Sequence, residues 1–468
     1  MKQLLFYMRK SSVMKRQFIL ITTLLLSAIA WSQNQRSLSE IKQIACDVLN
    51  NHSVPTSDIK GQTPRKVNKA KVEEVSIVNQ LDAITVVAQS DNGFVIVSND
   101  ERCEPVVGYS FKSYNTAIPD GFQWWLNAVN QSYSKNRPQT RSEVPSQYSP
   151  SVSPLLITQW GQSTPFNEKC PYLESGAFDE VSRSITGCVA TSLAQVLYYY
   201  RFPLQGNGSY TYDGGTFDYG NTVFEWGNML PSYSAGSYST DQANAVATLM
   251  YACGVAVDMN YGVYSSGAAF SKVVTALNNY FGYGDNVELI QRSDYHDDWM
   301  NRIYSELHHG RPVLYAGTAN SQDAAFQNDR SHAFVIDGYD TDGLVHVNWG
   351  WDGDYDGYFS IDALNPFPTS DDGFNDDQRM IVNIKDYIPH PNLIAKSVVV
   401  SGEKAIGENL SLTLQIGNTG INFNGKFYLF ASTEGWKESS PIQTENVSLN
   451  TDEEMTFTFS FTPVTAGS

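Results

Sequence analysis

Cys188 is the residue whose surroundings most favour covalent chemistry. It follows Thr186 and Gly187 and begins the segment CVATSLAQVLYYY, where apolar residues recur at helical spacing until Pro203. We therefore expect a helix that starts at Cys188 and is capped by Thr186 or Gly187. A thiol in a first helical turn faces unpaired amides and the helix dipole, which favour a nucleophilic thiolate. Since a free cysteine is most often a buried packing residue, this segment alone leaves both interpretations open.

A nucleophilic thiol needs a base, and His332 is the best placed of the seven histidines. The segments SHAFVIDG and LVHVNWGW predict a β-hairpin with its turn at 340–343, so His332 lies at the entrance of the first strand. The second strand returns Asn348, Trp349 and Trp351 to the same end. We expect Asn348 to fix the tautomer of the imidazole, and a tryptophan to exclude water.

The elements that position this pair lie in a chain of several domains. Lys15 and Arg16 precede a short apolar run, 18–30, that ends in small residues and is too short to span a bilayer comfortably. These features predict a signal peptide over residues 1–32. We accordingly expect a secreted protein, extracellular or on the cell surface, with no stable membrane insertion once the signal is removed.

Residues 33–145 are expected to form a separate α+β unit. A helical pattern covers 39–52, and strand patterns cover 84–89 and 93–98. The stretch 136–154 is polar and rich in proline, which predicts an exposed linker open to proteolytic nicking. A removable unit before a nickable linker is typical of a zymogen, although an ordinary interdomain linker has the same composition.

Two further units are expected. Residues 146–386 carry Cys188, His332 and many aromatic residues. Residues 391–468 contain LSLTLQIGN, GKFYLFAS and EMTFTFSFTP, whose alternation predicts a β-sandwich. The sequence ends just after the last of these strands, which leaves room for an incomplete sandwich.

Charge and cysteine content restrict the class of partner. Acidic residues outnumber basic ones by 49 to 31, so the 468-residue chain carries a formal net charge of −18. We expect it to repel phosphate backbones and predict no nucleic-acid partner. The cysteines number five, so an exported monomer leaves at least one unpaired, and none are spaced as in a zinc site. We predict no cofactor and leave open how the remaining cysteines pair: Cys46, Cys103, Cys170 and Cys253.

An acidic turn offers an alternative site. Asp352, Asp354, Asp356 and Gly357 match the start of an EF-hand loop, but the twelfth position is Ala363 instead of glutamate. We interpret the loop 352–362 as a solvated acidic turn and predict no metal site. His346, in the middle of the second hairpin strand, is interpreted as an ordinary surface or core histidine.

Several stretches together resemble the streptopain family of secreted bacterial papain-like cysteine peptidases. They are TGCVATSLAQVLYYYRFP, VAVDMNYG with SSG, SHAFVIDG, and HVNWGWDG with DGYFSIDALNP, and in order and spacing they cover nearly all of 155–386. GFVIVSNDERCEPVVGYS also resembles the propeptide of that family. The resemblance implies a two-lobed α+β fold, with a helical lobe bearing the cysteine and an antiparallel sheet lobe bearing the histidine. An α+β inhibitory propeptide would precede it, and an immunoglobulin-like all-β sandwich would follow.

The resemblance assigns the catalytic residues. The nucleophile is Cys188, the base is His332, and Asn348 and Trp349 orient and shield that base. The glutamine before a P-[YF]-N motif supplies the oxyanion hole, which picks Gln162 in QSTPFN, with Gln159 as second choice.

The resemblance also assigns a substrate-binding surface. A substrate-lining loop corresponds to Gly262–Gly267, and Ser331 replaces the usual glycine before the histidine. The family's preference is for a bulky apolar residue at P2. The substrate-binding residues predicted in this way are Gly262, Ser265, Ser266, Gly267, Ser331, Trp349 and Trp351.

The sequence thus predicts a secreted cysteine endopeptidase made as a zymogen, with protein or peptide substrates and its own propeptide as intramolecular inhibitor. Cys188 would form the acyl-enzyme, and His332 would serve as general base and acid. Two alternatives keep the fold but change the function. One is a catalytically inactive binding or adhesion protein, and the other is a thiol acyltransferase or transpeptidase.

Overall fold

A computed structural model provides the structure of the chain. It describes residues 34–52, 71–89, 93–115, 117–134, 141–175, 180–212, 215–284, 286–295, 297–319, 330–361, 378–385, 393–403, 405–418, 423–429, 443–450 and 453–462. The predicted signal peptide and residues 136–140 of the predicted linker lie outside these ranges. The described residues up to 385 belong to one compact unit, and those from 393 belong to a second.

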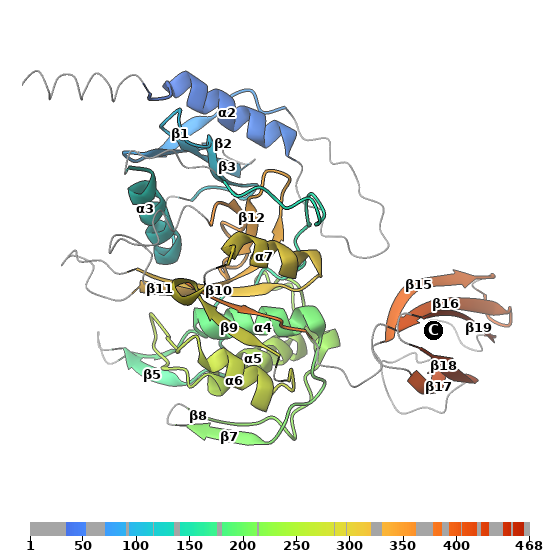
Figure 1. Cartoon of the computed structure of the whole chain (residues 1–468). Helices are drawn as coiled ribbons and strands as arrows, with labels where there is room; N and C mark the ends of the chain where they lie inside the picture. Colours follow the sequence, from blue (N-terminus) through green and yellow to red (C-terminus); the bar gives the residue numbers. More distant parts are fainter. Residues whose placement is uncertain are drawn as a thin grey trace, which may run out of the picture. The chain divides into compact units, whose positions relative to one another are not determined.

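Ten described strands of the first unit form a single antiparallel sheet (Figure 1). The strands of the predicted propeptide continue directly into the sheet that carries the hairpin, because β4 pairs with β13 through Tyr109 opposite Tyr358 and Gly108 opposite Phe359. In spatial order the strands are β1 (Ser76–Gln80), β2 (Ile84–Gln89), β3 (Gly93–Ser98), β4 (Val106–Ser110), β13 (Gly357–Phe359), β12 (Val345–Asn348), β11 (Arg330–Tyr339), β10 (Val313–Ala319), β14 (Arg379–Val382) and β9 (Glu288–Gln291).

Helices cover both faces of the sheet. Strand side chains alternate between the faces, so in β11 Phe334 joins the core that contains α3 and α7, whereas Val335 joins the core that contains α4. Helix α2 covers the face opposite α3 at the propeptide end, where Ile41 and Val95 share a core. The helices are α2 (Leu38–Asn51), α3 (Asp120–Ser134), α4 (Cys188–Tyr200), α5 (Thr240–Ala256), α6 (Lys272–Asn279) and α7 (Trp299–His308).

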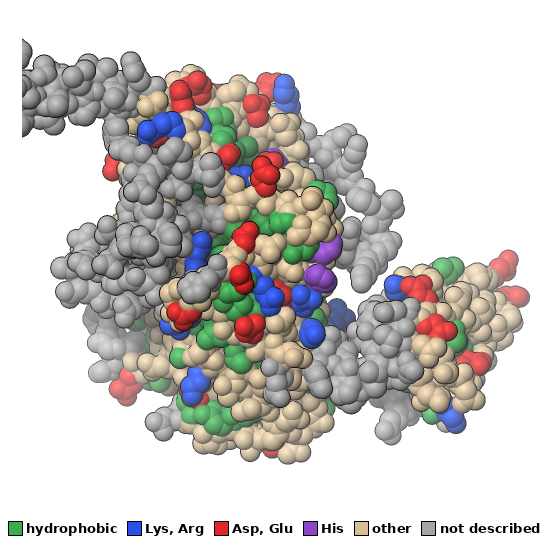
Figure 2. All heavy atoms as spheres, in the orientation of Figure 1, with side chains coloured by type: hydrophobic (Ala, Val, Ile, Leu, Met, Phe, Trp, Pro, Cys, Tyr) green, Lys and Arg blue, Asp and Glu red, His purple; other side chains and the backbone are tan. Residues whose placement is uncertain are grey.

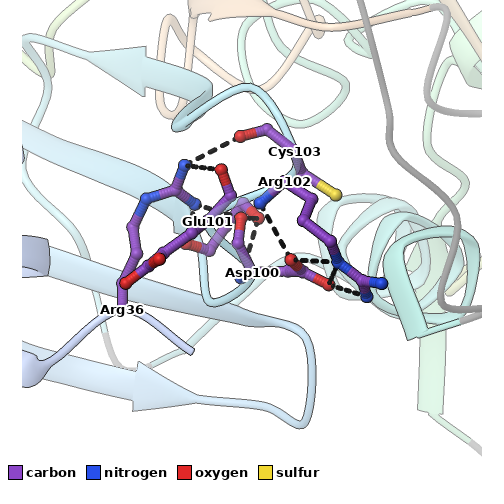
Figure 3. Close-up of polar contacts among 6 residues, drawn as sticks. Arg36, Asp100, Glu101, Arg102 and Cys103 are labelled. Carbon is purple, nitrogen blue, oxygen red and sulfur yellow. Dashed lines mark hydrogen bonds and ion pairs between the residues drawn. The ribbon is translucent and has the colours of Figure 1, made fainter. Parts of the chain in front are cut away.

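Local sequence explains where α2 and α5 begin. Ser37 and Glu40 form a capping box at α2, and Ser239 and Gln242 form another at α5, so the first amides of both helices are satisfied. Arg36, just before α2, donates from its guanidinium to the carbonyls of four residues in 98–103 (Figure 3). These bonds fasten the start of α2 to the loop between β3 and β4.

The described part of the predicted linker, 141–154, is attached to the sheet at its end. Val152 exchanges two backbone hydrogen bonds with Tyr339 at the end of β11, with N–O distances of 2.8 and 2.9 Å, and the amide of Leu155 donates to Asp337. The described residues of this stretch are exposed or half-buried, as predicted, but main-chain hydrogen bonds attach its end to β11. Two hairpins, β5 (Tyr172–Ser175) with β6 (Glu180–Arg183) and β7 (Ser209–Tyr212) with β8 (Gly215–Asp218), complete the strands described in the first unit.

The second unit consists of two small sheets over a shared core, as the predicted sandwich requires. One sheet orders β15 (Leu393–Ser401), β16 (Leu410–Asn418) and β19 (Glu454–Phe461), and the other pairs β17 (Phe423–Leu429) with β18 (Gln443–Leu449). Ile416, Val447 and Leu449 are buried between them. The immunoglobulin-like topology stays a prediction.

Two general properties bear on the sequence analysis. The five cysteines all lie in the described ranges, and no disulfide joins any two of them there. Within the described ranges, no helix combines the length and apolar character that a membrane span needs. On the face drawn in Figure 2, basic side chains are interspersed with acidic ones.

Candidate active site

The thiol of Cys188 lies at the start of α4, as predicted. Gly187 is the N-cap, with φ of 86° and no side-chain cap bond. A Cβ at Gly187 would come within 2.8 Å of Met259 and 3.0 Å of the Ser266 carbonyl, so both conformation and space require glycine. Cys188 itself is half-buried, and burial raises the pKa of its thiol, although hydrogen bonds from backbone amides, that of Ala333 first, oppose the rise.

The imidazole of His332 is buried on the sheet face that α3 covers. Its Nε2 lies 2.9 Å from the carbonyl oxygen of Trp349. Because a carbonyl only accepts, Nε2 carries the proton and Nδ1 is the basic nitrogen. Trp351 stacks on the ring, with centroids 4.6 Å apart. Burial lowers the pKa of His332 to about 4, so this imidazole is neutral at pH 7.

The structure brings the thiol of Cys188 and the imidazole of His332 to the same part of the fold, but the two groups are not hydrogen-bonded to each other. Helix α4 packs on β11, and the amide of Ala333, the residue after His332, reaches the Cys188 sulfur. Both residues are described, and no hydrogen bond joins the thiol to the ring. With the thiol pKa raised and the imidazole pKa lowered, the pair is neutral in this form of the chain.

Asn348 lies near His332 in the fold but has different hydrogen-bond partners from those expected. Its Oδ1 accepts from Gln195 Nε2 at 2.9 Å and from the amide of Gly350 at 3.2 Å, and its Nδ2 donates to the carbonyl of Thr158 at 2.7 Å. The imidazole is held by the main chain of Trp349, one residue further on. Asn348 therefore acts on His332 only indirectly, through the turn that contains Trp349.

Trp349 is fully buried and anchors the turn after β12. Its amide donates to Asp356 Oδ1 at 2.9 Å, and burial raises the pKa of Asp356 to about 7. The acidic turn is thus not purely solvated, because this carboxylate points inward. Asp352 also lies against the chain: a Cβ on Gly161 would fall within 2.5 Å of its carboxylate.

His346 forms a further ion pair near the turn. Its Nδ1 lies 2.6 Å from Asp337 Oδ1, and both side chains are largely buried. Asp337 and Asp356 raise the pKa of His346, although burial opposes them. His346 contacts neither Cys188 nor the ring of His332, in keeping with its interpretation as a core histidine.

Gln162 is bonded to the segment that leads into Cys188. Its carbonyl accepts from the amide of Thr186 at 3.1 Å, two residues before Cys188. Its half-buried side chain has no hydrogen-bond partner among the described residues, so the amide is available to a ligand. Gln159 instead packs over Gly353, where a Cβ would come within 2.8 Å of Gln159 Cγ, so the geometry favours Gln162.

The predicted substrate loop adjoins the same segment. Gly262 accepts from the amide of Ile185 at 3.1 Å, and Ser266 Oγ donates to the Ile185 carbonyl at 2.7 Å. Ser266 is buried and serves to tie the loop, whereas Ser265 and Gly267 are exposed beside it. Ser331 is also exposed, at the start of β11.

Helix α3 of the predicted propeptide covers His332. A Cβ on Gly121 would lie 2.7 Å from the Trp351 ring and 3.3 Å from the His332 ring. Phe122 and Trp125 of the same helix contact Trp349, with centroids 5.8 and 6.3 Å away. Sequence reasoning missed Gly121, for which the only signal is one glycine among bulky aromatic residues.

Comparisons with known proteins agree with this geometry. Residues 160–359 match the peptidase C10 family, and residues 34–133 match the family described as Spi protease inhibitor. The chain is 33% identical over 350 residues to streptopain of Streptococcus pyogenes serotype M28 (strain MGAS6180), which covers 69% of this chain and 86% of that protein. It is 32% identical over 323 residues to the thiol protease/hemagglutinin PrtT of Porphyromonas gingivalis, covering 63% and 36% of the two chains.

A solved structure shows the same fold. A prointerpain A fragment from Prevotella intermedia is 39% identical, covers 66% of this chain and 97% of its own, and superposes with a TM-score of 0.58. The resemblance found in the sequence is thereby confirmed, as are the papain-like fold and the inhibitory propeptide. The chain belongs to the peptidase C10 family, and it is a cysteine peptidase made as a zymogen.

Proposed function

We propose that this zymogen matures into an endopeptidase in which Cys188 is the nucleophile, His332 the base and Gln162 an oxyanion donor. The observation that carries the proposal is the hydrogen bond from His332 Nε2 to the Trp349 carbonyl. It leaves Nδ1 as the basic nitrogen on β11, the strand whose next residue, Ala333, contacts the thiol. Asn348 supports this turn, and Trp351 shields the ring.

The reaction begins when Nδ1 of His332 takes the proton of the Cys188 thiol. The thiolate attacks the peptide carbonyl carbon, and the resulting oxyanion accepts hydrogen bonds from the Gln162 side chain and the Cys188 amide. Collapse of this intermediate expels the amine, which takes the proton from Nδ1 and leaves a thioester. Nδ1 then deprotonates a water that attacks the thioester, and the carboxylic acid and the thiol are released.

The propeptide keeps this machinery inactive while it stays bound. Gly121 at the start of α3 lies against Trp351 and His332, and the buried imidazole and the half-buried thiol are both neutral. We take residues 33–145 as the propeptide, 146–386 as the peptidase and 1–32 as a signal peptide for secretion. Substrates are proteins or peptides, and family resemblance implies an apolar residue at P2.

The test compares the wild-type chain with Cys188→Ala on casein, with reductant present. Only the wild type should degrade casein and cut itself within 136–154. Cys46→Ala is the matched control, because Cys46 is a half-buried free cysteine on α2 and should behave as wild type. Casein degradation or self-cleavage by Cys188→Ala would overturn the assignment, and so would an epoxide-type thiol inhibitor that labels another cysteine.

A further inference from the structure

Gln195 is a fully buried polar residue in the middle of α4, the helix that Cys188 begins. Both ends of its side-chain amide are used. Oε1 accepts from Thr158 Oγ1 at 2.6 Å, and Nε2 donates to Asn348 Oδ1 at 2.9 Å. A buried amide would be costly without such partners, and Gln195 has the longest polar side chain buried in this helix, so its presence calls for a role.

The two partners belong to different parts of the catalytic machinery. Thr158 lies in the extended segment that leads to Gln162. Asn348 directly precedes Trp349, whose carbonyl holds His332. The Asn348 side chain also donates to the main-chain carbonyl of Thr158 at 2.7 Å, so the three residues close a ring of hydrogen bonds. This ring joins the helix of the nucleophile, the segment of the oxyanion donor and the turn that holds the base.

Fixed main-chain groups set the direction of every bond in the ring. The Thr158 carbonyl can only accept, so it requires the NH₂ of Asn348, and the Gly350 amide can only donate, so it requires Asn348 Oδ1. Gln195 must then present its NH₂ to Asn348 and its oxygen to the Thr158 hydroxyl. A glutamate or an apolar residue cannot supply that donor.

We propose that Gln195 is a positioning residue of the peptidase, which aligns Cys188, Gln162 and His332 through this ring of hydrogen bonds. The proposal rests on the proposed function, because alignment is defined by the reaction of Cys188. Without the NH₂ donor, Asn348 loses a partner and the turn at Trp349 can shift. The Trp349 carbonyl then no longer directs Nδ1 of His332 toward the thiol. A misplacement of about 1 Å lowers catalysis roughly 100-fold.

The experiment uses Gln195→Leu, which keeps the approximate volume but removes both hydrogen bonds. The matched control is Tyr198→Phe, which removes a buried hydrogen bond of 3.1 Å from the same helix to the Met229 carbonyl, away from Cys188. Each full-length chain is matured with immobilised wild-type enzyme, which is then removed. The measurements are kcat and KM on a peptide substrate, the thermal midpoint, and the pH dependence of Cys188 alkylation by iodoacetamide.

In Gln195→Leu we expect kcat to fall about 10- to 100-fold with KM within about threefold. The alkylation profile should move toward that of an ordinary thiol, with a pKa near about 8.5. Tyr198→Phe should keep both within twofold of wild type. Wild-type kcat and alkylation in a folded Gln195→Leu would overturn the proposal, as would equal losses in Tyr198→Phe.

A second variant covers the case in which Gln195→Leu does not fold. Thr158→Val removes only the hydroxyl that orients Gln195, and we expect a smaller loss of kcat in the same direction, about 3- to 10-fold. An unchanged kcat in Thr158→Val would count against the ring as an aligning device. Failure of the Gln195 proposal can be distinguished from failure of the proposed function, because only the latter would leave peptidase activity in Cys188→Ala.

Discussion

The contact between Gly121 and the catalytic side chains makes the strength of inhibition sensitive to one methyl group. In Gly121→Ala, the new Cβ would lie 2.7 Å from the Trp351 ring, where carbon atoms normally keep about 3.5 Å. Trp351 cannot swing away cheaply, because it stacks on Trp349 at 5.3 Å and on His332 at 4.6 Å. Overpacking of this kind costs about 1–3 kcal/mol.

The overpacking destabilises only the form of the zymogen in which α3 covers His332. Since about 1.4 kcal/mol corresponds to a tenfold change in an equilibrium, the open fraction of the zymogen should rise about 5- to 150-fold in Gly121→Ala. Gly121→Leu should raise it further. Gln131→Ala is the control, because Gln131 is exposed on the same helix and its replacement by alanine favours the helix slightly without new contacts.

The assay is the rate at which iodoacetamide labels Cys188 in the intact chain, located by mass spectrometry before self-cleavage begins. Labelling requires the open form, so its rate reports the open fraction. We expect the order wild type and Gln131→Ala, then Gly121→Ala, then Gly121→Leu. Equal labelling of all four chains, within twofold, would show that α3 does not control access to the thiol.

Three other outcomes follow from the geometry. Gln162→Ala should lower kcat about 100-fold with little change in KM, measured on a peptide substrate, and an unchanged kcat would exclude it from the oxyanion hole. Burial lowers the pKa of His332 to about 4, below the ordinary value near 6.5, so the covered form is most stable above about pH 6.5 and loses stability as the pH falls toward 4. Amide exchange in α3 of the Cys188→Ala zymogen, corrected for intrinsic rates, should therefore be faster at pH 4.5 than at pH 7, and equal protection would contradict this. Tyr109→Phe removes the 2.9 Å hydrogen bond to Asp340 across the junction of the propeptide and the peptidase. It should lower the free energy of unfolding, measured by urea titration, by about 1–2 kcal/mol. An unchanged free energy would show that water replaces the bond.

Elements with a strong local pattern were predictable from the sequence. The helix at Cys188, the strands 84–89, 93–98 and 410–418, and the hairpin that bears His332 all appear within a residue or two of their predicted bounds. Each combines a regular hydrophobic period with a clear stop signal, such as Pro203 or the turn after β11. The positions of Cys188 and His332 on these elements followed directly.

Features that depend on long-range pairing were not predictable in the same way. The junction of β4 with β13 joins residues distant in the chain, and a local period does not indicate which strands become neighbours. The sequence predicted that Asn348 would fix the tautomer of His332, but the Trp349 carbonyl accepts the hydrogen bond from Nε2. Main-chain geometry decides which acceptor lies next to Nε2, and a local pattern does not indicate it. Gln195 could not be recognised from the sequence for a related reason, since a glutamine in a helical segment gives no indication of its distant hydrogen-bond partners.

The continuous sheet has a consequence for maturation. Cutting the chain between the propeptide and the peptidase breaks one covalent link but leaves the β4–β13 pairing and the α3 contacts in place. Before the cut, the inhibitor is present at the high effective concentration of a tethered group, independent of dilution. After the cut, its occupancy obeys mass action, so a concentrated preparation remains occupied and a dilute one becomes free. The onset of activity should then depend on total protein concentration as well as on the number of chains cut.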